Sequence, residues 1–206
     1  MTKTFALLLF LFSVPVQAVE LEFALGYTQF HRIHRDNYWY QEPFPYEHDL
    51  TSEAFRLGVR KRYGDWTYGL AYLQLGTAKV NATVIPSDEA YGRCVAGDKS
   101  SNGCAYPTTK LWVEDKVRGL ELSAARSFDQ FYARGGLMLW HHYLRFGTDY
   151  GEGPAQIDVL LAPFLGVGVE YKPLFLEVNY YHVLGDGAFP IAKKATTFMA
   201  GIRIRI

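Results

Sequence analysis

TTFMAGIRIRI, residues 196–206, is the stretch that decides the fold of this chain. Read as a strand, it has one apolar face, which includes Ile202 and Ile204, and one face that carries Arg203 and Arg205. A terminal strand with an unpaired edge invites aggregation, and arginines on an enclosed face need carboxylate partners. The stretch therefore predicts a closing strand, with the rest of the chain supplying both the neighbouring edge and the carboxylates.

Alternation of apolar and other residues recurs along the whole chain. The segments that show it are residues 20–30, 52–63, 66–78, 116–128, 131–144, 159–171, 174–183 and 197–206. None of them has a 3.6-residue period, so the chain is predicted to be all-β. Strands of about 10 to 14 residues are longer than those of most soluble sheets and suit a tilted crossing of a bilayer.

The connections between these segments alternate in length. Tight turns are expected at residues 64–65, 129–130 and 172–173, and long loops at 31–51, 79–115, 145–158 and 184–196. Residues 106–113 are also a candidate extension of the sheet above the membrane. This pattern predicts a closed antiparallel eight-stranded transmembrane β-barrel with short periplasmic turns and long extracellular loops.

The two faces of the predicted strands differ in bulk. A soluble barrel such as a lipocalin would turn the apolar face inward, but large residues such as Leu57 and Leu70 are too bulky for an eight-stranded lumen. The other face mixes glycines with charges and predicts a narrow polar lumen. Aromatic residues are expected to form two belts at the membrane interfaces. These belts comprise Tyr63, Trp66, Phe128, Phe131 and Tyr171 beside the turns, and Phe30, Tyr72, Tyr143, Tyr180 and Phe198 toward the loops.

The N-terminal residues 1–18 have the pattern of a secretory signal. Lys3 precedes a short apolar run, and Ala18 closes a small-residue cleavage site, which leaves residues 19–206 as one outer-membrane barrel domain. Equal numbers of basic and acidic residues, 21 of each, give no indication of nucleic acid as a partner. Cys94 and Cys104 predict one loop disulfide of an exported protein; no nearby histidine completes a metal site with them.

Residues 19–206 resemble the small eight-stranded outer-membrane proteins, the group of the OmpA transmembrane domain, OmpX and the Ail/Lom proteins. The resemblance lies in the architecture of alternating strands, tight turns and long loops. Members of that group often end in an aromatic residue, whereas this chain ends in Ile206. The resemblance implies a monomer in the bacterial outer membrane, with lipid and lipopolysaccharide as its surroundings.

Inward-facing charges form the first candidate site. Strands one and eight become neighbours on closure, which brings Glu20 and Glu22 beside Arg203 and Arg205. Buried charges persist only when they are paired, so we predict an ion-pair network that plugs the lumen and fixes the register. The alternative is a charged gate in a narrow pore. The predicted network comprises Glu20, Glu22, Arg56, Arg60, Glu121, Arg134, Glu170, Glu177, Arg203 and Arg205.

Aromatic residues of the first two long loops form the second candidate site. Proline and the predicted disulfide would stiffen them, and rigid aromatic surfaces lose little entropy on binding. The candidate surface comprises Tyr38, Trp39, Tyr40, Phe44, Tyr46, Tyr91, Tyr106 and Trp112. The prediction is a structural or surface-interaction protein without a cofactor, whose loops meet lipopolysaccharide, a host surface or phage; packing of these aromatics on one another is the other interpretation.

Enzymatic activity is the remaining alternative, because some eight-stranded barrels modify lipid A. His182 resembles the late-strand histidine of the PagL-type deacylase, but that family has serine two residues later, where this chain has Leu184. The PagP-type palmitoyltransferase begins with an amphipathic helix, whereas here the first strand directly follows the signal. Adjacent histidines such as His141 and His142 point to opposite faces of a strand and do not predict a metal site.

Overall fold

The computed structural model describes residues 19–31, 46–84, 109–148, 151–153, 155–184 and 193–206, and these residues form ten strands. Eight long strands build the barrel, and two short strands lie beyond it. The long strands are β1 (Val19–His31), β3 (Thr51–Tyr63), β4 (Trp66–Val84), β5 (Thr109–Phe128), β6 (Phe131–Thr148), β8 (Gln156–Tyr171), β9 (Leu174–His182) and β10 (Lys194–Arg205); the short ones are β2 (Tyr46–Asp49) and β7 (Gly151–Glu152). The described residues contain no helix long and apolar enough to cross a membrane.

The eight long strands form a closed antiparallel barrel. Sequential barrel strands pair with one another, and β1 pairs with β10 to complete the ring. In that seam Glu22 lies opposite Arg203 and Glu20 lies opposite Arg205. The backbone of Ile206 donates a hydrogen bond of 2.9 Å to the carbonyl of Val19, which secures the end of the chain. The predicted all-β eight-stranded architecture is thus confirmed, with each predicted segment in its own barrel strand.

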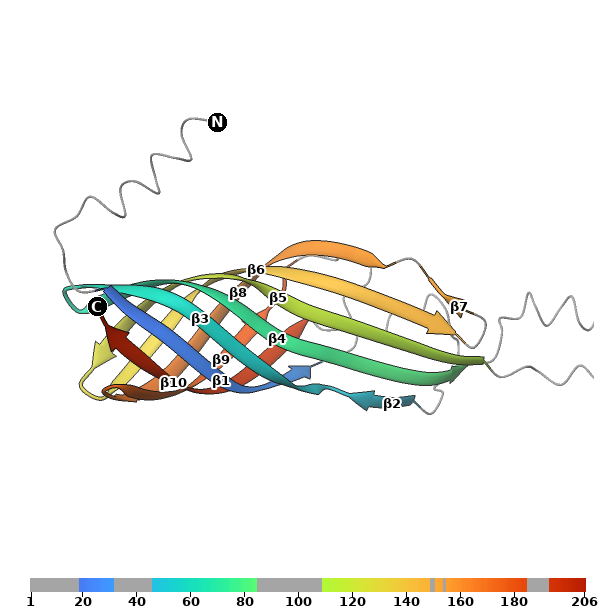
Figure 1. The fold of residues 1–206 in the computed structure, drawn as a ribbon, viewed down its shortest axis with the longest axis horizontal. Coiled ribbons are helices and arrows are strands. Elements are labelled where there is room, and N and C mark those ends of the chain that lie inside the picture. Colours follow the sequence, from blue (N-terminus) through green and yellow to red (C-terminus); the bar gives the residue numbers. More distant parts are fainter. Residues whose placement is uncertain (1–18, 32–45, 85–108, 149–150, 154, 185–192) are drawn as a thin grey trace, which may run out of the picture.

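The barrel has two unlike ends, which we call the turn end and the projecting end (Figure 1). The turn end holds the C-terminus and the three tight turns that the sequence predicts. Gly64 and Asp129 adopt positive φ angles of 58° and 59° in two of these turns, and the Lys172–Pro173 peptide bond in the third is cis. At the other end, β4, β5 and β6 extend well beyond the remaining strands.

This extension, which we call the projecting sheet, corrects the predicted loop boundaries. Residues 79–84 and 109–115 were expected in a loop, but they continue β4 and β5, whose pairing runs out to Val84 opposite Thr109. The expected strand at residues 106–113 is confirmed for 109–113; residues 106–108 lie outside the described part. Continued cross-strand hydrogen bonding overrode the local turn composition. Short β2 and β7 pair with β4 and β6, which covers edges that would otherwise invite aggregation.

Outward-facing residues form an apolar band around the barrel, as predicted. On β5 the exposed residues between Arg118 and Arg126 are Leu120 and Leu122, with the partly exposed Ala124 after them. Eight residues of a strand tilted by about 40° span roughly 20 Å, close to the apolar height of an outer-membrane barrel once long arginine side chains reach outward.

β3 repeats this spacing. Exposed Glu53 and partly exposed Lys61 face outward at either side of Phe55, Leu57 and Val59. The apolar band is therefore bounded by charged residues at the same interval on two separate strands.

One prediction for the aromatic belts is wrong. Phe30 is 1% exposed and faces the lumen, because it has the inward parity of β1.

The charged side chains of the lumen concentrate in the half nearest the turn end, which we call the lower lumen. The upper half is packed mainly with buried apolar and aromatic side chains that the sequence analysis did not predict, together with the buried Thr28 and Thr197. Trp140 and Tyr181 lie at the centre of this packing, with ring centroids 6.0 Å apart. The remaining large members are Phe30, Leu73, Leu75, Val117 and Met138. The sequence analysis did not single out Trp140, although it has the inward parity of β6.

A bulge in β4 lets its upper part turn into the projecting sheet. The β4–β5 register shifts between Gln74 and Gly76, and Gly76 has a φ of 93°. A β-carbon placed on Gly76 would lie 2.1 Å from Oγ of Ser52 and 2.6 Å from the carbonyl oxygen of Glu53. Glycine is required there by both its backbone conformation and the lack of space.

Replacing Gly76 by alanine is therefore expected to destabilise the folded barrel by about 1 to 3 kcal/mol. Urea melting of the protein in micelles, followed by the mobility difference between heated and unheated samples on gels, measures the effect. Gly64→Asn is the control, because Gly64 also has positive φ but has open space around it. Equal stability of the two variants would contradict this account of the bulge.

Candidate functional site

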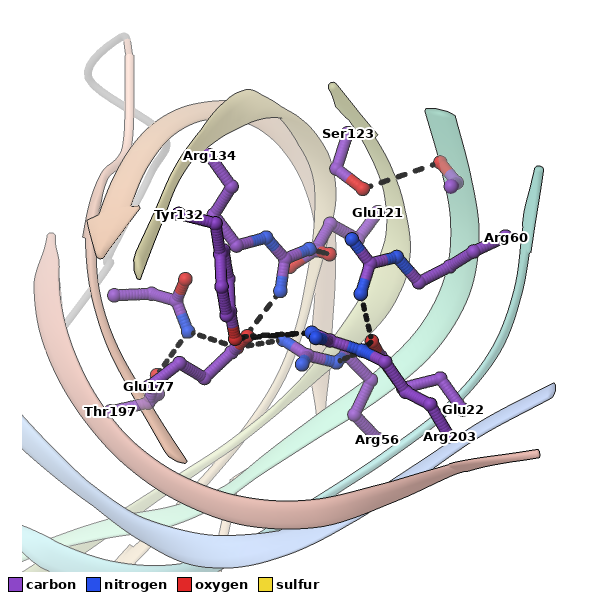
Figure 2. Close-up of polar contacts among 12 residues, drawn as sticks. Glu22, Arg56, Arg60, Glu121, Ser123, Tyr132, Arg134, Glu177, Thr197 and Arg203 are labelled. Carbon is purple, nitrogen blue, oxygen red and sulfur yellow. Dashed lines mark hydrogen bonds and ion pairs between the residues drawn. The ribbon is translucent and has the colours of Figure 1, made fainter. Parts of the chain in front are cut away.

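Glu22 on β1 is the first centre of the lower-lumen charges. Its side chain is buried, and its oxygens lie 2.7 Å from Nε of Arg56 and 3.0 Å from Nη1 of Arg60, both on β3. Across the seam, Nε of Arg203 on β10 donates to it at 2.8 Å. One carboxylate therefore connects the first strand to both of its neighbours, including the one that closes the barrel (Figure 2).

Glu177 on β9 is the second centre, and its charged partners reach it from across the lumen. Arg56 on β3 and Arg134 on β6 both donate to Oε1, the latter at 2.8 Å. Tyr132 donates to Oε2 at 2.8 Å, and Asn179 donates to Oε1 at 2.7 Å. This residue collects two charged and two neutral donors, which is what a fully buried carboxylate requires.

Two further glutamates complete the set. Arg134 also pairs with Glu121 on β5, which accepts a hydrogen bond of 2.8 Å from Tyr181. Arg203 also pairs with the partly buried Glu170 on β8. Counted among the described side chains, four glutamates face four arginines, so their formal charges cancel. We call these eight residues the lumen network: Glu22, Glu121, Glu170, Glu177, Arg56, Arg60, Arg134 and Arg203.

Aromatic rings enclose the guanidinium groups of the network. The Arg203 guanidinium lies 3.9 Å from the ring centroid of Phe175 and 4.8 Å from that of Tyr132, and Arg134 lies 5.1 Å from that of Phe164. These contacts shield planar cations from water while leaving their edges free to donate hydrogen bonds. The network is therefore held in a packed setting in which a missing partner cannot be replaced by bulk water.

Two of the predicted members lie outside this network. Glu20 and Arg205 are opposite each other in the β1–β10 register, but within the described part of the chain they form no ion pair. Arg205 is exposed at the turn end, where water can solvate its charge. Tyr132, Tyr181 and Asn179 donate hydrogen bonds to the network although the sequence analysis did not single them out; their inward parity was the signal that would have found them.

A second buried polar pair lies at the base of the projecting sheet. Nδ1 of His142 lies 2.8 Å from Oδ2 and 3.0 Å from Oδ1 of Asp115, and both side chains are buried. The sequence analysis missed this pair because it placed Asp115 in a loop. Among the described residues, no three His, Cys, Asp or Glu side chains converge as they would around a metal ion.

The outer face of the projecting sheet carries charges in two rows. In the upper row, Lys79 pairs with Glu114 at 3.1 Å, and Arg145 pairs with Glu152 at 2.9 Å. The hydrogen bond with Glu152 raises the pKa of Arg145, so this guanidinium is fully charged at neutral pH. The Arg145 guanidinium also lies 5.6 Å from the ring centroid of Trp112.

The lower row lies directly above the apolar band and has a different character. Exposed Lys116 and Arg118 on β5 form no ion pair with any described carboxylate. Their register partners on β6 are Tyr143 and His141, and Nε of Arg118 lies 3.5 Å from Nδ1 of His141. We call Lys116, Arg118 and His141 the outer cationic cluster. It places positive charge at one boundary of the band, with no counter-charge from the carboxylates that the structure describes.

The predicted aromatic loop surface is largely outside the described residues. This applies to Tyr38, Trp39, Tyr40, Phe44, Tyr91 and Tyr106, and to the predicted disulfide between Cys94 and Cys104. Trp112 instead lies in β5, where it is half-buried beside Arg145. The backbone of Tyr46 pairs with that of Ala82 in β2 and β4.

The residues compared with the lipid A enzymes lie at the projecting end of β9. His182 is exposed there and pairs in register with Lys194, and Leu184, in the position of the deacylase serine, is also exposed. Within the described part, no serine hydroxyl is hydrogen-bonded to a histidine; Nε2 of His31 instead lies 2.8 Å from Oγ1 of Thr196.

The closed ring of eight antiparallel strands, with an apolar outside and paired charges inside, defines a small transmembrane β-barrel. Neither a family model nor a curated protein matches the sequence. Solved structures are similar to it in fold. The attachment invasion locus protein Ail of Yersinia pestis, solved with the heparin analogue sucrose octasulfate, is 15% identical at a TM-score of 0.50, covering 91% of this chain and 100% of Ail.

Neisserial surface protein A is a second similar structure. It is 12% identical at a TM-score of 0.42, and the match covers 93% of this chain and 100% of that protein. The likeness to Ail shows that the two chains share a fold. The architectural resemblance to small eight-stranded outer-membrane barrels is thereby confirmed.

Removing the charge of Glu177 should destabilise the barrel, because Glu177 is a centre of the lumen network. Glu177→Gln leaves Arg56 and Arg134 without their shared carboxylate, and we expect a loss of about 3 to 5 kcal/mol in unfolding free energy. Glu152→Gln is the control, because Glu152 and its partner Arg145 are both exposed to solvent, and an exposed ion pair contributes little to stability. Urea titration in micelles measures both, and a similar small loss in each would overturn this role of Glu177.

Proposed function

We propose that this chain is an outer-membrane surface protein, in which a barrel with a closed lumen holds the projecting sheet at the cell surface. In this proposal residues 1–18 are a cleaved signal, the turn end faces the periplasm, and the protein is a monomer. The outer cationic cluster anchors the barrel in lipopolysaccharide. Cys94 and Cys104 are proposed to form a disulfide in the second long loop.

The observation that carries this proposal is the pattern of outward residues on β5. Arg118 and Arg126 bracket a span of the strand whose outward residues are all apolar, and Glu53 and Lys61 bracket an equal span on β3. A chain that met only water would have no reason to restrict charge to these two levels. The spacing fits a hydrocarbon layer with polar headgroups on both sides.

Lipopolysaccharide is the partner that best matches the outer cationic cluster. Phosphate groups of its lipid A part lie where the hydrocarbon layer ends, at the level that Lys116 and Arg118 occupy in this placement. Arginine and lysine bind phosphate through charge-assisted hydrogen bonds, and a nearby carboxylate would compete for them. The carboxylates of Glu114 and Glu152 are engaged one row higher, with Lys79 and Arg145.

A closed lumen is favoured over a pore by two successive obstructions. The lumen network fills the lower lumen, and the packed layer around Trp140 and Tyr181 lies above it. Ions would have to cross an apolar layer even if the network rearranged, and the desolvation that this requires is costly. The alternative of a charged gate is therefore the weaker proposal.

The projecting sheet and the loops beyond it are proposed to contact other molecules outside the cell. The barrel supplies a stiff base, and the sheet carries exposed charges and the Trp112 ring away from the membrane. Sucrose octasulfate is named as a ligand of Ail and not of this chain. A host-surface molecule or a phage protein remains the proposed class of partner, and no cofactor is proposed.

Loss of the outer cationic cluster should release lipopolysaccharide. We expect the double variant Lys116→Gln, Arg118→Gln to lose lipopolysaccharide during purification, so that it retains about one tenth of the wild-type amount or less. Each lost charged hydrogen bond is worth about 1.5 to 3 kcal/mol. Mass spectrometry of lipid A released per mole of protein measures this. Arg145→Gln is the matched control, because Arg145 lies on the same sheet face but pairs with Glu152. Retention equal to wild type would contradict the anchoring role.

The closed lumen predicts electrical behaviour that separates this proposal from a pore. Wild-type protein in planar bilayers should show no steady conductance. Arg134→Gln should also stay closed, because the layer around Trp140 is unchanged, although it should lower stability. A steady conductance that rises in Arg134→Gln would show that the network is a gate, and the closed-lumen proposal would then fail.

A further inference from the structure

Arg126 on β5 is an outward-facing cation at the turn end of the apolar band. It lies opposite Trp66 of β4 in the sheet register, and Phe128 follows two residues later on the same face. The Arg126 guanidinium is 5.8 Å from the ring centroid of Trp66 and 5.5 Å from that of Phe128. All three side chains are exposed, so they form a small surface group, which we call the aromatic–arginine clamp.

The clamp lacks a protein counter-charge among the described residues, since Arg126 forms no ion pair with their carboxylates. The two rings lie close to the guanidinium and favour it electrostatically, yet neither takes up its N–H donors. These donors suit a bidentate acceptor such as a phosphate. Toward the band centre the same face of β5 continues with Ala124 and Leu122, which offer an apolar surface.

From this arrangement we infer that the aromatic–arginine clamp binds the phosphate of a glycerophospholipid, with the lipid's acyl chains against the apolar band. This inference rests on the membrane placement proposed above, in which the turn end lies at the inner leaflet of the outer membrane. That leaflet consists of glycerophospholipids, whereas the outer cationic cluster at the other end of β5 meets lipopolysaccharide. One strand thus contacts a different phosphorylated lipid at each boundary of the membrane.

Position distinguishes the clamp from an ordinary exposed arginine. Arg62, also exposed at the turn end, donates through Nε to the backbone carbonyl of Gly64 at 3.2 Å. It lies on the lumen parity of β3 and beyond the apolar band, and no ring contact of its guanidinium is found among the described residues. A charge held on the lipid-facing side at the band boundary costs free energy unless a headgroup compensates it. Arg126 lies on the lipid-facing side at the band boundary and needs such a headgroup, whereas Arg62 does not.

The test is lipid binding by the full-length chain, purified in a nonionic detergent and titrated with dimyristoyl phosphatidylglycerol under native mass spectrometry. We expect Arg126→Gln to weaken binding of the first lipid by at least about tenfold, as the loss of a charged bidentate contact implies. Arg62→Gln should bind like wild type. Trp66→Leu should weaken binding to a smaller extent, because it keeps the charge but removes one ring.

Two further probes identify what is recognised. Dimyristoylglycerol, which has the same acyl chains but no phosphate, should bind weakly and equally to wild type and Arg126→Gln. Inorganic phosphate at millimolar concentration should not displace phosphatidylglycerol, because it lacks the acyl contacts. Displacement by inorganic phosphate would show a simple anion site, and equal affinity of wild type and Arg126→Gln for phosphatidylglycerol would refute the clamp.

The result can be separated from a failure of the proposed function. Heat-dependent gel mobility of Arg126→Gln should match wild type, since the residue is exposed and forms no ion pair with a described carboxylate, so lost lipid binding would not reflect a lost fold. Retention of lipopolysaccharide should also be unchanged in Arg126→Gln, because the outer cationic cluster lies at the other end of β5. If lipopolysaccharide retention fails in wild type while the clamp binds phospholipid, the outer anchor alone is wrong.

Discussion

The pairing of buried carboxylates with buried arginines is the interaction on which this barrel depends. A ring of eight strands leaves an interior just wide enough for side chains, and charges placed there lose most of their hydration. Glu22 and Glu177 compensate for that loss by each binding arginines from other strands. Counted over the described side chains, every barrel strand except β4 contributes to the resulting group of charges and its hydrogen-bonded neighbours.

This interaction also fixes the register. A shift of β10 by one residue in the seam would place Ile202 or Ile204 opposite Glu22 in the lumen and turn Arg203 toward lipid, so the buried charges and the apolar band select the same pairing. The upper lumen adds a second constraint. The packed aromatic layer around Trp140 in the upper lumen needs no charge compensation. The network is therefore confined to the lower lumen.

On the outer surface, too, charged residues lie at defined depths. On β5 the cations at residues 118 and 126 lie at the two boundaries of the apolar band, and each is next to a ring, that of His141 at one end and those of Trp66 and Phe128 at the other. Higher on the projecting sheet, where water is available, Lys79 and Arg145 pair with carboxylates instead. Depth in the proposed membrane thus accounts for the contrast between Arg118 and Arg126 at the band boundaries and the carboxylate-paired Lys79 and Arg145 above them.

Much of the fold was readable from local sequence, because strand parity is a local property. Alternation located all eight barrel strands and the outward set, and the tight turns followed from their composition. It failed where pairing partners decide the outcome: β4 and β5 run on to Val84 and from Thr109, since each stabilises the other through hydrogen bonds that no single segment reveals. Asp115 was misplaced in a loop for the same reason.

The candidate site divides in a similar way. The sequence by itself determined which charges face inward, and hence that Glu22 must meet Arg203 once the first and last strands close the ring. Only the tertiary structure decided that Glu177 binds Arg56 and Arg134, that Glu20 and Arg205 remain outside the network, and that His142 meets Asp115. The physical reason is that parity assigns a side chain to a face, whereas contacts across a lumen depend on the stagger of strands far apart in the sequence.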